Sequence, residues 1–390
     1  MIKVTDKSKC CGCSACANVC PKKCISMISD EKGFLYPTIN EAVCVNCGLC
    51  EKICPILNSK SNAEEKSAYA AYNKDNETRK VSSSGGIFGC VADKILYKGG
   101  VVFGAAYSDD FKAIKHIGVE SKADLSKLYG SKYLQSEIGG AYKSAEEYLK
   151  AGREVLFVGM SCQISGLKAY LRKDYENLLT VDVICHGTPS PRVWKEYAVE
   201  KESEFQSKIV AADFRNKRFG WDKSVLLLLF ANGKEYCALG SKDEYIKGFL
   251  MNLYLRESCY KCVCKGNNVL SDISLGDFWG IDNVLPNFSD NKGASAIILN
   301  TGKGKDFFNK IIKDNLVTEE VTYDDVLKGN PALVTPVEKP GKSDKFWNVY
   351  RKYGLTKAYK KYLKVSFARK CYRLVRRVGS KVKRTIIKKN

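Results

Sequence analysis

The sequence predicts a mixed α/β, or α+β, protein in three parts: a small cysteine-rich domain (residues 1–57), a mixed-sheet α/β domain (67–340) and a basic helical tail (345–390). Three observations support this fold class. A four-cysteine pattern occurs twice before residue 57, strand-like and helix-like segments alternate after residue 67, and the last 46 residues hold 17 Lys or Arg and no Asp or Glu. With 390 residues, 45% of them hydrophobic, the chain can build a sizeable core and two or three domains.

The N-terminal domain is defined by a duplicated cysteine pattern. Each copy has three cysteines three positions apart, a fourth four positions later, and then a proline. The copies are Cys10, Cys13, Cys16 and Cys20, and Cys44, Cys47, Cys50 and Cys54. Three such thiolates bind three irons of one cubane, and the fourth reaches the other cluster. We predict a ferredoxin-like domain with two [4Fe–4S] clusters, one held by Cys10, Cys13, Cys16 and Cys54 and one by Cys44, Cys47, Cys50 and Cys20.

Two other uses of these cysteines fit the pattern less well. Zinc ribbons pair two Cys-x2-Cys units and lack the third cysteine at the same step. A disulfide framework needs an oxidising compartment, and the N-terminus has no apolar segment typical of a secretory signal. Cys11 and Cys24 are extra to the pattern, and we interpret Cys11 as a non-ligand neighbour and Cys24 as a small apolar residue.

The central domain alternates predicted strands and helices after a polar linker near residues 58–66. Strands are expected at 67–72, 100–107, 154–159, 178–184, 209–214, 225–231, 234–239, 273–276 and 294–300. Helices are expected from the small-residue loop 82–86 to about 97, and at 139–151, 163–173, 191–205 and 243–256. This order predicts a sheet that mixes parallel and antiparallel strands. Neither a dinucleotide-binding GxGxxG after a strand nor a phosphate-binding P-loop is present.

Several segments together resemble the coenzyme F-420 hydrogenase/dehydrogenase beta-subunit family. They are Ser83-Ser84-Gly85-Gly86, the segment 130–136, the segment 156–164, the segment 184–191, Cys259-Tyr260-Lys261-Cys262 and the segment 271–280. The similarity runs from about Ser67 to Gly302 and includes an N-terminal two-cluster extension. Met160-Ser161-Cys162 departs from the Thr-Pro-Cys that relatives often carry there.

The resemblance implies an iron–sulfur flavoprotein that binds FAD. The loop Ser83, Ser84, Gly85 and Gly86 leads into a helix, where backbone N–H groups and hydroxyls suit a pyrophosphate. The segment with Ser131, Lys132, Tyr133 and Gln135 supplies a cation, hydroxyls and a ring for the flavin, and Lys132 can stabilise an anionic reduced flavin. Alternatively, the loop at Ser83–Gly86 is a plain Ser/Gly turn that caps the helix, and Lys132 is a solvated lysine in a surface loop.

The resemblance also implies a third [4Fe–4S] cluster, held by Cys162, Cys185, Cys259 and Cys262. Cys264 competes as a ligand, and some of these thiols can instead be buried core residues. His186 and Asp277 join Lys132 as candidate catalytic residues, His186 as a proton donor near the flavin and Asp277 as an active-site carboxylate. Alternatively, His186 is a polar loop residue whose hydrogen bonds are satisfied, and Asp277 is a turn or cap residue.

Most of the net charge of +21 lies in the tail, because the rest of the chain carries 47 basic and 43 acidic residues. A basic amphipathic helix can lie on an anionic membrane surface. An acidic protein partner and a solvated helix are the alternatives, and we expect no nucleic-acid partner because no recognition motif accompanies the charge. No apolar run is long enough to span a bilayer. We expect a cytoplasmic protein that the tail could bring to the inner face of the membrane.

The predicted function is that of an oxidoreductase relaying electrons between ferredoxin-type clusters and FAD, for reduction or oxidation of an organic substrate. The resemblance points to a small-molecule or glycan-related substrate, with polysaccharide biosynthesis as one setting, and to a redox partner such as ferredoxin or a deazaflavin. One alternative is an electron-transfer subunit without a substrate of its own. Another is a peripheral-membrane scaffold in surface-glycan assembly whose clusters are structural.

Overall fold

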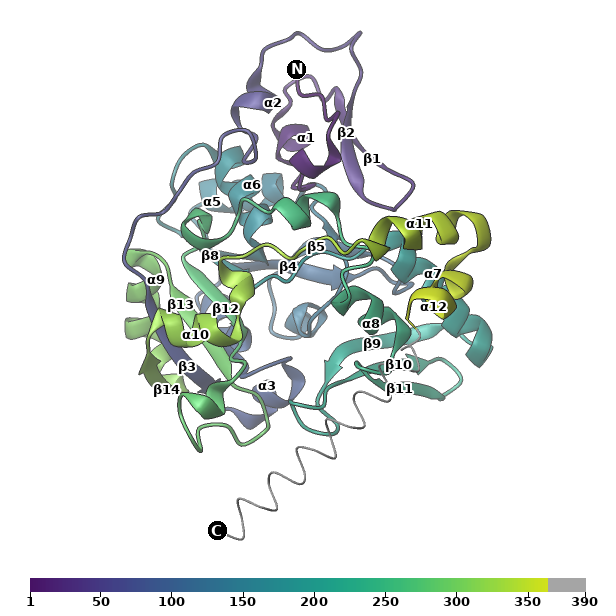
Figure 1. Ribbon diagram of the computed structural model, residues 1–390. Coiled ribbons are helices and arrows are strands. Elements are labelled where there is room, and N and C mark those ends of the chain that lie inside the picture. The colour runs from purple at the N-terminus through teal and green to yellow at the C-terminus, as the bar shows by residue number, and fades with distance from the viewer. Residues whose placement is uncertain (364–390) are drawn as a thin grey trace. The chain divides into compact units, whose positions relative to one another are not determined.

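The computed structural model describes residues 1–363, and the predicted tail beyond Leu363 lies outside the described residues. The chain divides into two compact units, Met1–Lys339 and a second that begins at Pro340 (Figure 1). The first unit is built on a nine-stranded mixed sheet with the strand order β14-β3-β13-β12-β8-β7-β4-β5-β6. Its strands are β3 (Ser67–Asn73), β4 (Val101–Tyr107), β5 (Ile114–Val119), β6 (Ser136–Glu137), β7 (Val155–Met160), β8 (Leu178–Val183), β12 (Ile273–Asp277), β13 (Ser295–Leu299) and β14 (Leu316–Val321).

Four neighbouring strands, β4, β7, β8 and β12, run parallel, and β13, β3 and β14 continue the sheet in antiparallel fashion. The mixed α/β fold class predicted from the sequence is therefore confirmed. Strands β5, β6 and β14 were not predicted, because they are short or carry charged residues and lack a long apolar run.

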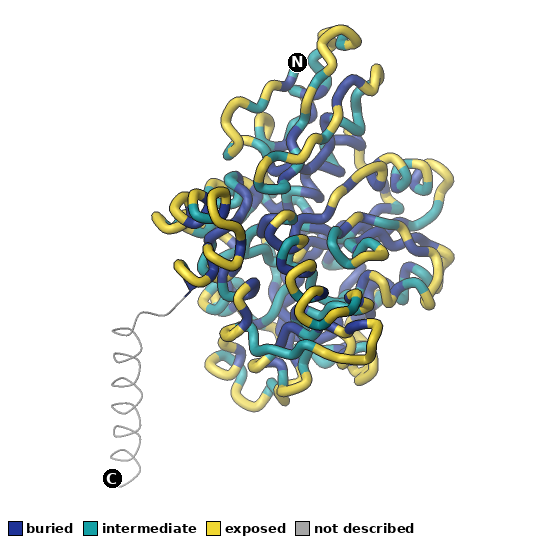
Figure 2. Tube along the Cα trace, turned by 90° about the vertical axis from the view of Figure 1, so that its right-hand side faces the viewer, coloured by how far each residue is buried: buried dark blue, intermediate teal, exposed yellow. Residues whose placement is uncertain are grey.

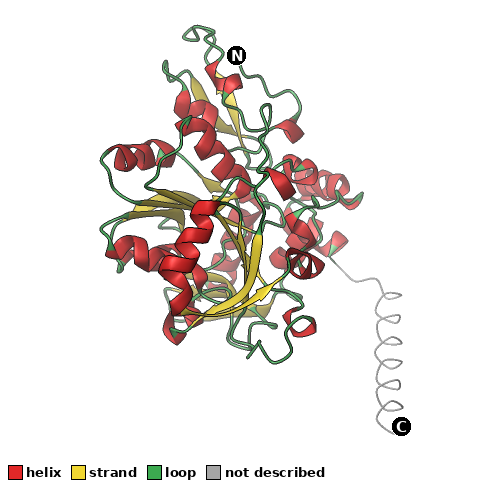
Figure 3. Cartoon of the chain, turned by 90° about the vertical axis from the view of Figure 1, so that its left-hand side faces the viewer, coloured by secondary structure: helices red, strands yellow, loops and turns green. Residues whose placement is uncertain are grey.

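Alternate residues of the strands enter different cores on the two faces of the sheet, as the two-residue period of a strand requires. On one face, Leu156 and Ile297 pack with helices α4 and α9. On the other, Val155 and Phe157 pack with α5 and α6. Figure 3 shows helices on both sides of the sheet. The helices of this unit are α1 (Ala15–Val19), α2 (Leu49–Lys52), α3 (Asn76–Val81), α4 (Ile87–Tyr97), α5 (Ala141–Lys150), α6 (Ser161–Leu171), α7 (Pro191–Phe205), α8 (Glu244–Leu250), α9 (Gly302–Phe307) and α10 (Tyr323–Gly329).

The N-terminal region adds a two-stranded antiparallel hairpin, β1 (Ile25–Ser29) and β2 (Leu35–Ile39). Its helix α1 packs on α5 and α6, and Cys11, Cys13 and Ala15 share a core with Phe157 and Leu167. Figure 2 shows buried segments running from the sheet into this region, whose outer loops are exposed. The first half of the cysteine region is therefore part of the main core.

A second sheet holds β9 (Ile209–Asn216), β10 (Val225–Phe230) and β11 (Glu235–Leu239), with the predicted hairpin turn at Asn232-Gly233. The helix expected over 243–256 is too long, because α8 ends at Leu250. Asn252 adopts a left-handed backbone (φ 57°), and the Leu253 N–H bonds back to the Gly248 carbonyl. Residues 251–256, which follow the end of this helix, include Asn252 and Arg256, whose contacts are described below.

The polar stretch expected as a linker is held along the main unit. The Asn62 N–H donates to the Asn267 carbonyl at 2.6 Å, and its side-chain amide donates to the Asn300 carbonyl at 2.7 Å. Lys66 donates to the Gly266 carbonyl. The domain boundaries at residues 57, 67 and 340 stay predictions.

In the second unit, two helices, α11 (Lys342–Tyr353) and α12 (Leu355–Tyr362), are separated by Gly354, whose φ of 79° favours glycine. The Phe346 ring lies 6.1 Å from Tyr359 and 6.3 Å from Tyr362. Helical structure in the first part of the predicted tail is thus confirmed for two short helices. Among residues 1–363, none of the helices combines the length and apolar character needed to cross a bilayer.

Candidate redox site at the carboxyl edge of the sheet

The parallel strands end side by side and place their following loops together. Strand β7 ends at Met160, β8 at Val183, and β12 at Asp277. Ligands of open α/β sheets bind at this carboxyl edge. A cavity of about 430 Å³ opens here, and its walls come from the loops after β7 and β8, the segment 256–265 and the N-terminal region.

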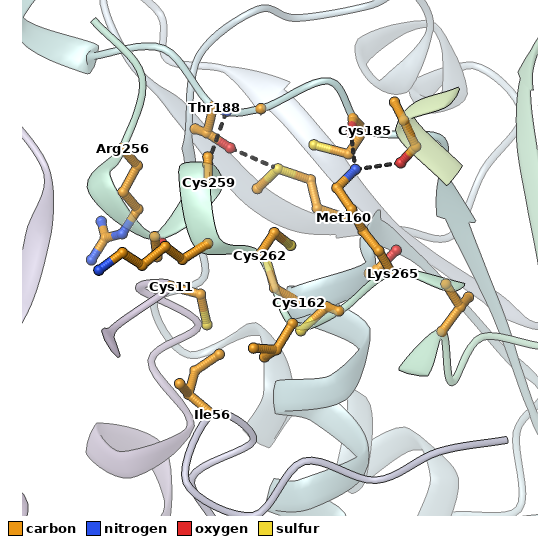
Figure 4. Close-up of a pocket in the computed structure, with 18 of the residues that line it drawn as sticks. Cys11, Ile56, Met160, Cys162, Cys185, Thr188, Arg256, Cys259, Cys262 and Lys265 are labelled. Carbon is orange, nitrogen blue, oxygen red and sulfur yellow. Dashed lines mark hydrogen bonds between the residues drawn. The ribbon is translucent and has the colours of Figure 1, made fainter. Parts of the chain in front are cut away.

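The cavity is unusually rich in sulfur. Four of its lining residues are the cysteines predicted to hold a third cluster, Cys162, Cys185, Cys259 and Cys262. Figure 4 shows them around one space, together with Cys11 and Met160. Cys264 also lines it. The structure thus brings together the four predicted cysteines, which span 100 positions from Cys162 to Cys262, and their role as ligands stays a prediction.

Each of these cysteines is held by local structure. Cys162 is in the first turn of α6, Cys185 follows β8, and Cys259 lies in the 3-10 helix Glu257–Lys261. The Thr188 N–H donates to the Cys259 sulfur at 3.3 Å, a contact that suits a thiolate. Burial raises the pKa of Cys185 to about 12 and that of Cys259 to about 11. Thiolates are therefore unfavourable at Cys185 and Cys259 unless a cation such as cluster iron balances them, whereas a hydrogen bond from Cys264 lowers the pKa of Cys262 to about 7.

A buried carboxylate, Asp182, is among the residues that line this cavity. Asp182 accepts hydrogen bonds from the hydroxyls of Ser161, Ser271 (2.6 Å) and Ser274 (2.5 Å). Burial raises its pKa. The Lys265 ammonium, which also lines the cavity, donates to the carbonyls of Cys185 (2.8 Å) and Ala332 and so fixes the loop that carries Cys185. No sequence pattern indicated this network, because its members come from four separate segments.

The first predicted set of N-terminal ligands also converges. Cys16 is close enough to Cys10 and Cys54 for their charges to interact, and Cys13 is similarly close to Cys16. Cys54 comes from the other repeat, as the crossed arrangement requires. Burial, the largest cause, raises the pKa of Cys16 to about 12, so a thiolate here again needs a cation.

The second predicted set, Cys20, Cys44, Cys47 and Cys50, lines one small cavity of about 20 Å³. Cys24 lines it too, with its sulfur 3.4 Å from that of Cys20. Cys47 is exposed. Within residues 1–363, no three Cys, His or carboxylate side chains converge as ligands of a single metal ion.

The predicted flavin residues lie at the same edge of the sheet. The Ser83 hydroxyl accepts hydrogen bonds from the Ser131 N–H (2.6 Å) and the Ser131 hydroxyl (2.9 Å), so the two predicted loops touch. Ser131 and Lys132 line a cavity of about 310 Å³ together with Tyr107 and Asp213. The Tyr107 hydroxyl is buried without a hydrogen-bond partner, which fits a polar ligand in this cavity.

Lys132 is not a solvated lysine. Its ammonium donates to the carbonyls of Leu128, Tyr129 and Gly130 at 2.8–3.2 Å. Burial lowers its pKa to about 7, and the charge of Asp213 opposes that change. Lys132 can therefore hold or release a proton near neutral pH.

Other predicted cofactor residues are engaged elsewhere. Ser84 donates to the Ala294 carbonyl, and the Gly85 N–H donates to Ser295. Gly86 has a φ of 85° and caps α4. Tyr133 packs against Phe214 and Phe249. Gln135 bonds to Arg256 and to the Cys11 carbonyl, facing the N-terminal region and not the cavity of Lys132.

The two remaining catalytic candidates are separated. His186 lines the cysteine-rich cavity, and its Nε2 lies 2.7 Å from the Asn252 side-chain oxygen. Burial lowers its pKa. Asp277 does not line that cavity, because it accepts from Trp221 Nε1 at 2.7 Å and pairs with Arg215 at 3.1 Å. The loop arginine Arg218 likewise pairs with Glu235.

The structure also places Arg256 where no sequence signal indicated a role. Its side chain is almost completely buried and lies between the cysteine-rich cavity and the first cysteine repeat. It donates to the carbonyls of Cys10 (2.8 Å) and Leu35 (2.9 Å) and approaches the Cys10 sulfur at 3.6 Å.

Comparison with known proteins assigns both parts. Residues 152–324 match the family model described as the C-terminal part of the coenzyme F420 hydrogenase/dehydrogenase beta subunit. Residues 9–57 match a 4Fe-4S dicluster domain. The chain is therefore similar to the F420 hydrogenase/dehydrogenase beta subunit over residues 152–324 and carries an N-terminal dicluster domain. The predicted resemblance is confirmed, and the chain is an iron–sulfur, oxidoreductase-like electron-transfer protein related to that beta subunit.

Among solved structures, a similar chain occurs in the F420-reducing [NiFe] hydrogenase complex from Methanosarcina barkeri. It is 19% identical, with a TM-score of 0.49, and the match covers 77% of this chain and 96% of that one. No curated protein is significantly similar in sequence.

Proposed function

We propose that this protein is an iron–sulfur flavoprotein oxidoreductase in which the two N-terminal clusters, a third cluster and FAD form one electron relay. The observation that carries the proposal is the cavity where Cys162, Cys185, Cys259 and Cys262 meet, because Cys11 of the first repeat forms part of the same wall. The neighbouring cavity of Ser131 and Lys132 supports a flavin at the same edge.

The side chains have distinct roles in this proposal. The N-terminal cysteines hold the two ferredoxin-type clusters, and the cavity cysteines hold the third. Ser83 and Ser131 orient the flavin, and Lys132, with a pKa of about 7, holds a proton beside it. FAD, when bound, supplies the conversion between one-electron and two-electron chemistry. His186 is the proposed proton donor on the side of the third cluster.

The test is anaerobic purification and reconstitution, followed by iron, sulfide and flavin analysis. We expect iron and sulfide for three cubanes and one FAD per chain. Lys132→Met should weaken flavin retention, and Cys259→Ala should remove one cluster's iron while flavin and the N-terminal clusters remain. A wild-type chain that binds zinc and no iron would overturn the proposal. A chain with iron but no flavin would support only a ferredoxin-type protein and would overturn the flavoprotein part.

The matched family is described as a beta subunit, which favours a second candidate. In this candidate the chain passes electrons to a partner and has no substrate of its own. Reduction of the flavin by a deazaflavin or a small-molecule donor in the isolated chain would support the enzyme. Flavin reduction only through the N-terminal clusters, or only when a partner is added, would support the electron-transfer role. A glycan-related substrate and a membrane-bound tail belong to the same proposal, tested by substrate screening and liposome binding of the full chain.

A further inference from the structure

The two cysteine repeats differ in one electrostatic feature. Arg256 is about 1% exposed, and its guanidinium is surrounded by carbonyls, the Gln135 side chain (2.9 Å) and the Cys10 sulfur (3.6 Å). It also lies over the Tyr36 ring at 4.2 Å. Within residues 1–363, no carboxylate forms an ion pair with it. A buried arginine without a counter-charge is costly, so an anion is expected beside it.

The anion that this site offers is the first cluster. A [4Fe–4S] cubane bound by four thiolates carries net negative charge, and Cys10 is one of its predicted ligands. Because Arg256 donates toward that sulfur at 3.6 Å, its positive charge would lie beside a cluster that Cys10 binds. Charge and hydrogen bonds at cluster sulfurs are among the factors that set the reduction potential.

The second repeat has no equivalent. Its corresponding cysteine, Cys44, has only a weak contact with the Asn46 side-chain oxygen at 3.9 Å. In the part of the chain that the structure describes, no Lys or Arg side chain donates to a sulfur of the second set. The N-terminal ammonium lines that site but pairs with Glu51 at 3.2 Å.

The two repeats also differ in the residue type at one equivalent position. Gly12 and Asn46 occupy the same position of the duplicated pattern, and both have a left-handed backbone (φ 72° and 51°). A Cβ at Gly12 would lie 2.8 Å from Arg256 Nη1 and 2.9 Å from its Cζ. Glycine is therefore required in the first repeat to admit the guanidinium, whereas exposed Asn46 occupies the second.

We propose that Arg256 is the counter-charge of the first cluster and raises that cluster's reduction potential. Reduction adds one electron to the cluster and no proton, and Arg256 stabilises the added negative charge that burial would otherwise disfavour. Arg256 is thus a positioning residue that keeps the buried cluster reducible. This inference rests on the proposed function, because it needs the first cluster to be present.

The experiment is a dithionite titration of the full chain followed by EPR, with Cys47→Ala used to assign the second cluster's signal. We expect Arg256→Gln to shift the first cluster's midpoint to more negative potential and to leave the second unchanged. Arg256→Lys should shift it less, because the charge is kept. Gly12→Ala should shift it in the same direction by displacing the guanidinium, and the matched change Asn46→Ala should shift neither midpoint.

Unchanged midpoints, or equal shifts of both clusters, would overturn the inference while leaving the proposed function intact. If Arg256→Gln fails to assemble the first cluster, the midpoint potentials of Arg256→Lys and Gly12→Ala test the inference instead. The inference would be overturned if neither variant shifted the first cluster's midpoint. A wild-type chain that assembles no cluster would contradict the proposed function itself.

Discussion

The two cysteine repeats have the same spacing and opposite surroundings. The first places Cys11 and Cys13 in the core shared with the main sheet and receives Arg256. The second leaves Cys47, Val43 and Val45 exposed. The same ligand spacing therefore occurs twice, and the rest of the fold gives the two copies different environments: the first is packed against the main core and the second is largely exposed to solvent.

The largest difference should follow from removing one ligand in each repeat. Cys16→Ala should lose the first cluster and leave Arg256 buried without its counter-charge, costing roughly 3–5 kcal/mol of unfolding free energy. Cys47→Ala should lose the second cluster at a cost of about 1 kcal/mol, because that residue is exposed. Anaerobic urea unfolding and iron analysis measure both, and equal costs would contradict the comparison.

Substituting one glycine near each repeat tests the same difference in packing. A Cβ at Gly166 in α6 would lie 2.8 Å from both the Cys13 Cβ and the Tyr142 hydroxyl, so Gly166→Val should force the first repeat away from the core and cost about 3 kcal/mol. At Gly48 in the second repeat a Cβ would meet nothing within 4 Å, and Gly48→Ala should cost only about 1 kcal/mol, from its backbone φ of 71°. Thermal unfolding of both variants would show the difference, and the opposite ranking would refute it.

The exposed repeat should govern the rate of electron entry. Lys22 lines the second site and Lys23 follows it, and both are exposed. Lys22→Glu/Lys23→Glu should slow reduction by an acidic ferredoxin roughly tenfold at low ionic strength, with little effect at high salt. Stopped-flow absorbance measures this rate. Lys310→Glu, at an exposed position of the π-helical segment Phe308–Ile312 of the main unit, is the matched control, and equal slowing by that change would argue against entry at the second repeat.

The smallest expected effect comes from pH. Burial lowers the pKa of His116 from 6.5 to about 4, and the ring stacks on Phe157 in the core that also holds Cys13. Between pH 6.5 and 4 the His116 imidazole is protonated in the unfolded chain but neutral in the folded one. The free energy of unfolding therefore decreases as the pH is lowered through this range. From pH 7.5 to 5.5 this group should cost about 1 kcal/mol.

Urea midpoints at the two pH values measure the loss due to His116. His116→Asn should remove that part of the pH dependence, whereas His186→Gln should retain it. A His116→Asn variant with the wild-type slope would show that another group is responsible.

The sequence by itself determined the duplicated cysteine pattern, the resemblance to the F420 hydrogenase/dehydrogenase beta subunit and most strands of the main sheet, whereas the crossed assignment of ligands to two clusters stays a prediction. These depend on local spacing and on continuous apolar runs, which a single segment displays. It overextended the helix before Arg256 and missed β5, β6 and β14, because short or charged strands are stabilised by their neighbours in the sheet.

Only the tertiary structure decided the environments of the sites. It placed Cys11 beside four cysteines from later segments, directed Gln135 toward Arg256, and paired Asp277 with Arg215. Nothing in the segment around Arg256 marks it as a partner of Cys10, 246 residues earlier. Burial and charge pairing depend on which segments meet across the fold, and that information is absent from the spacing of residues along the chain.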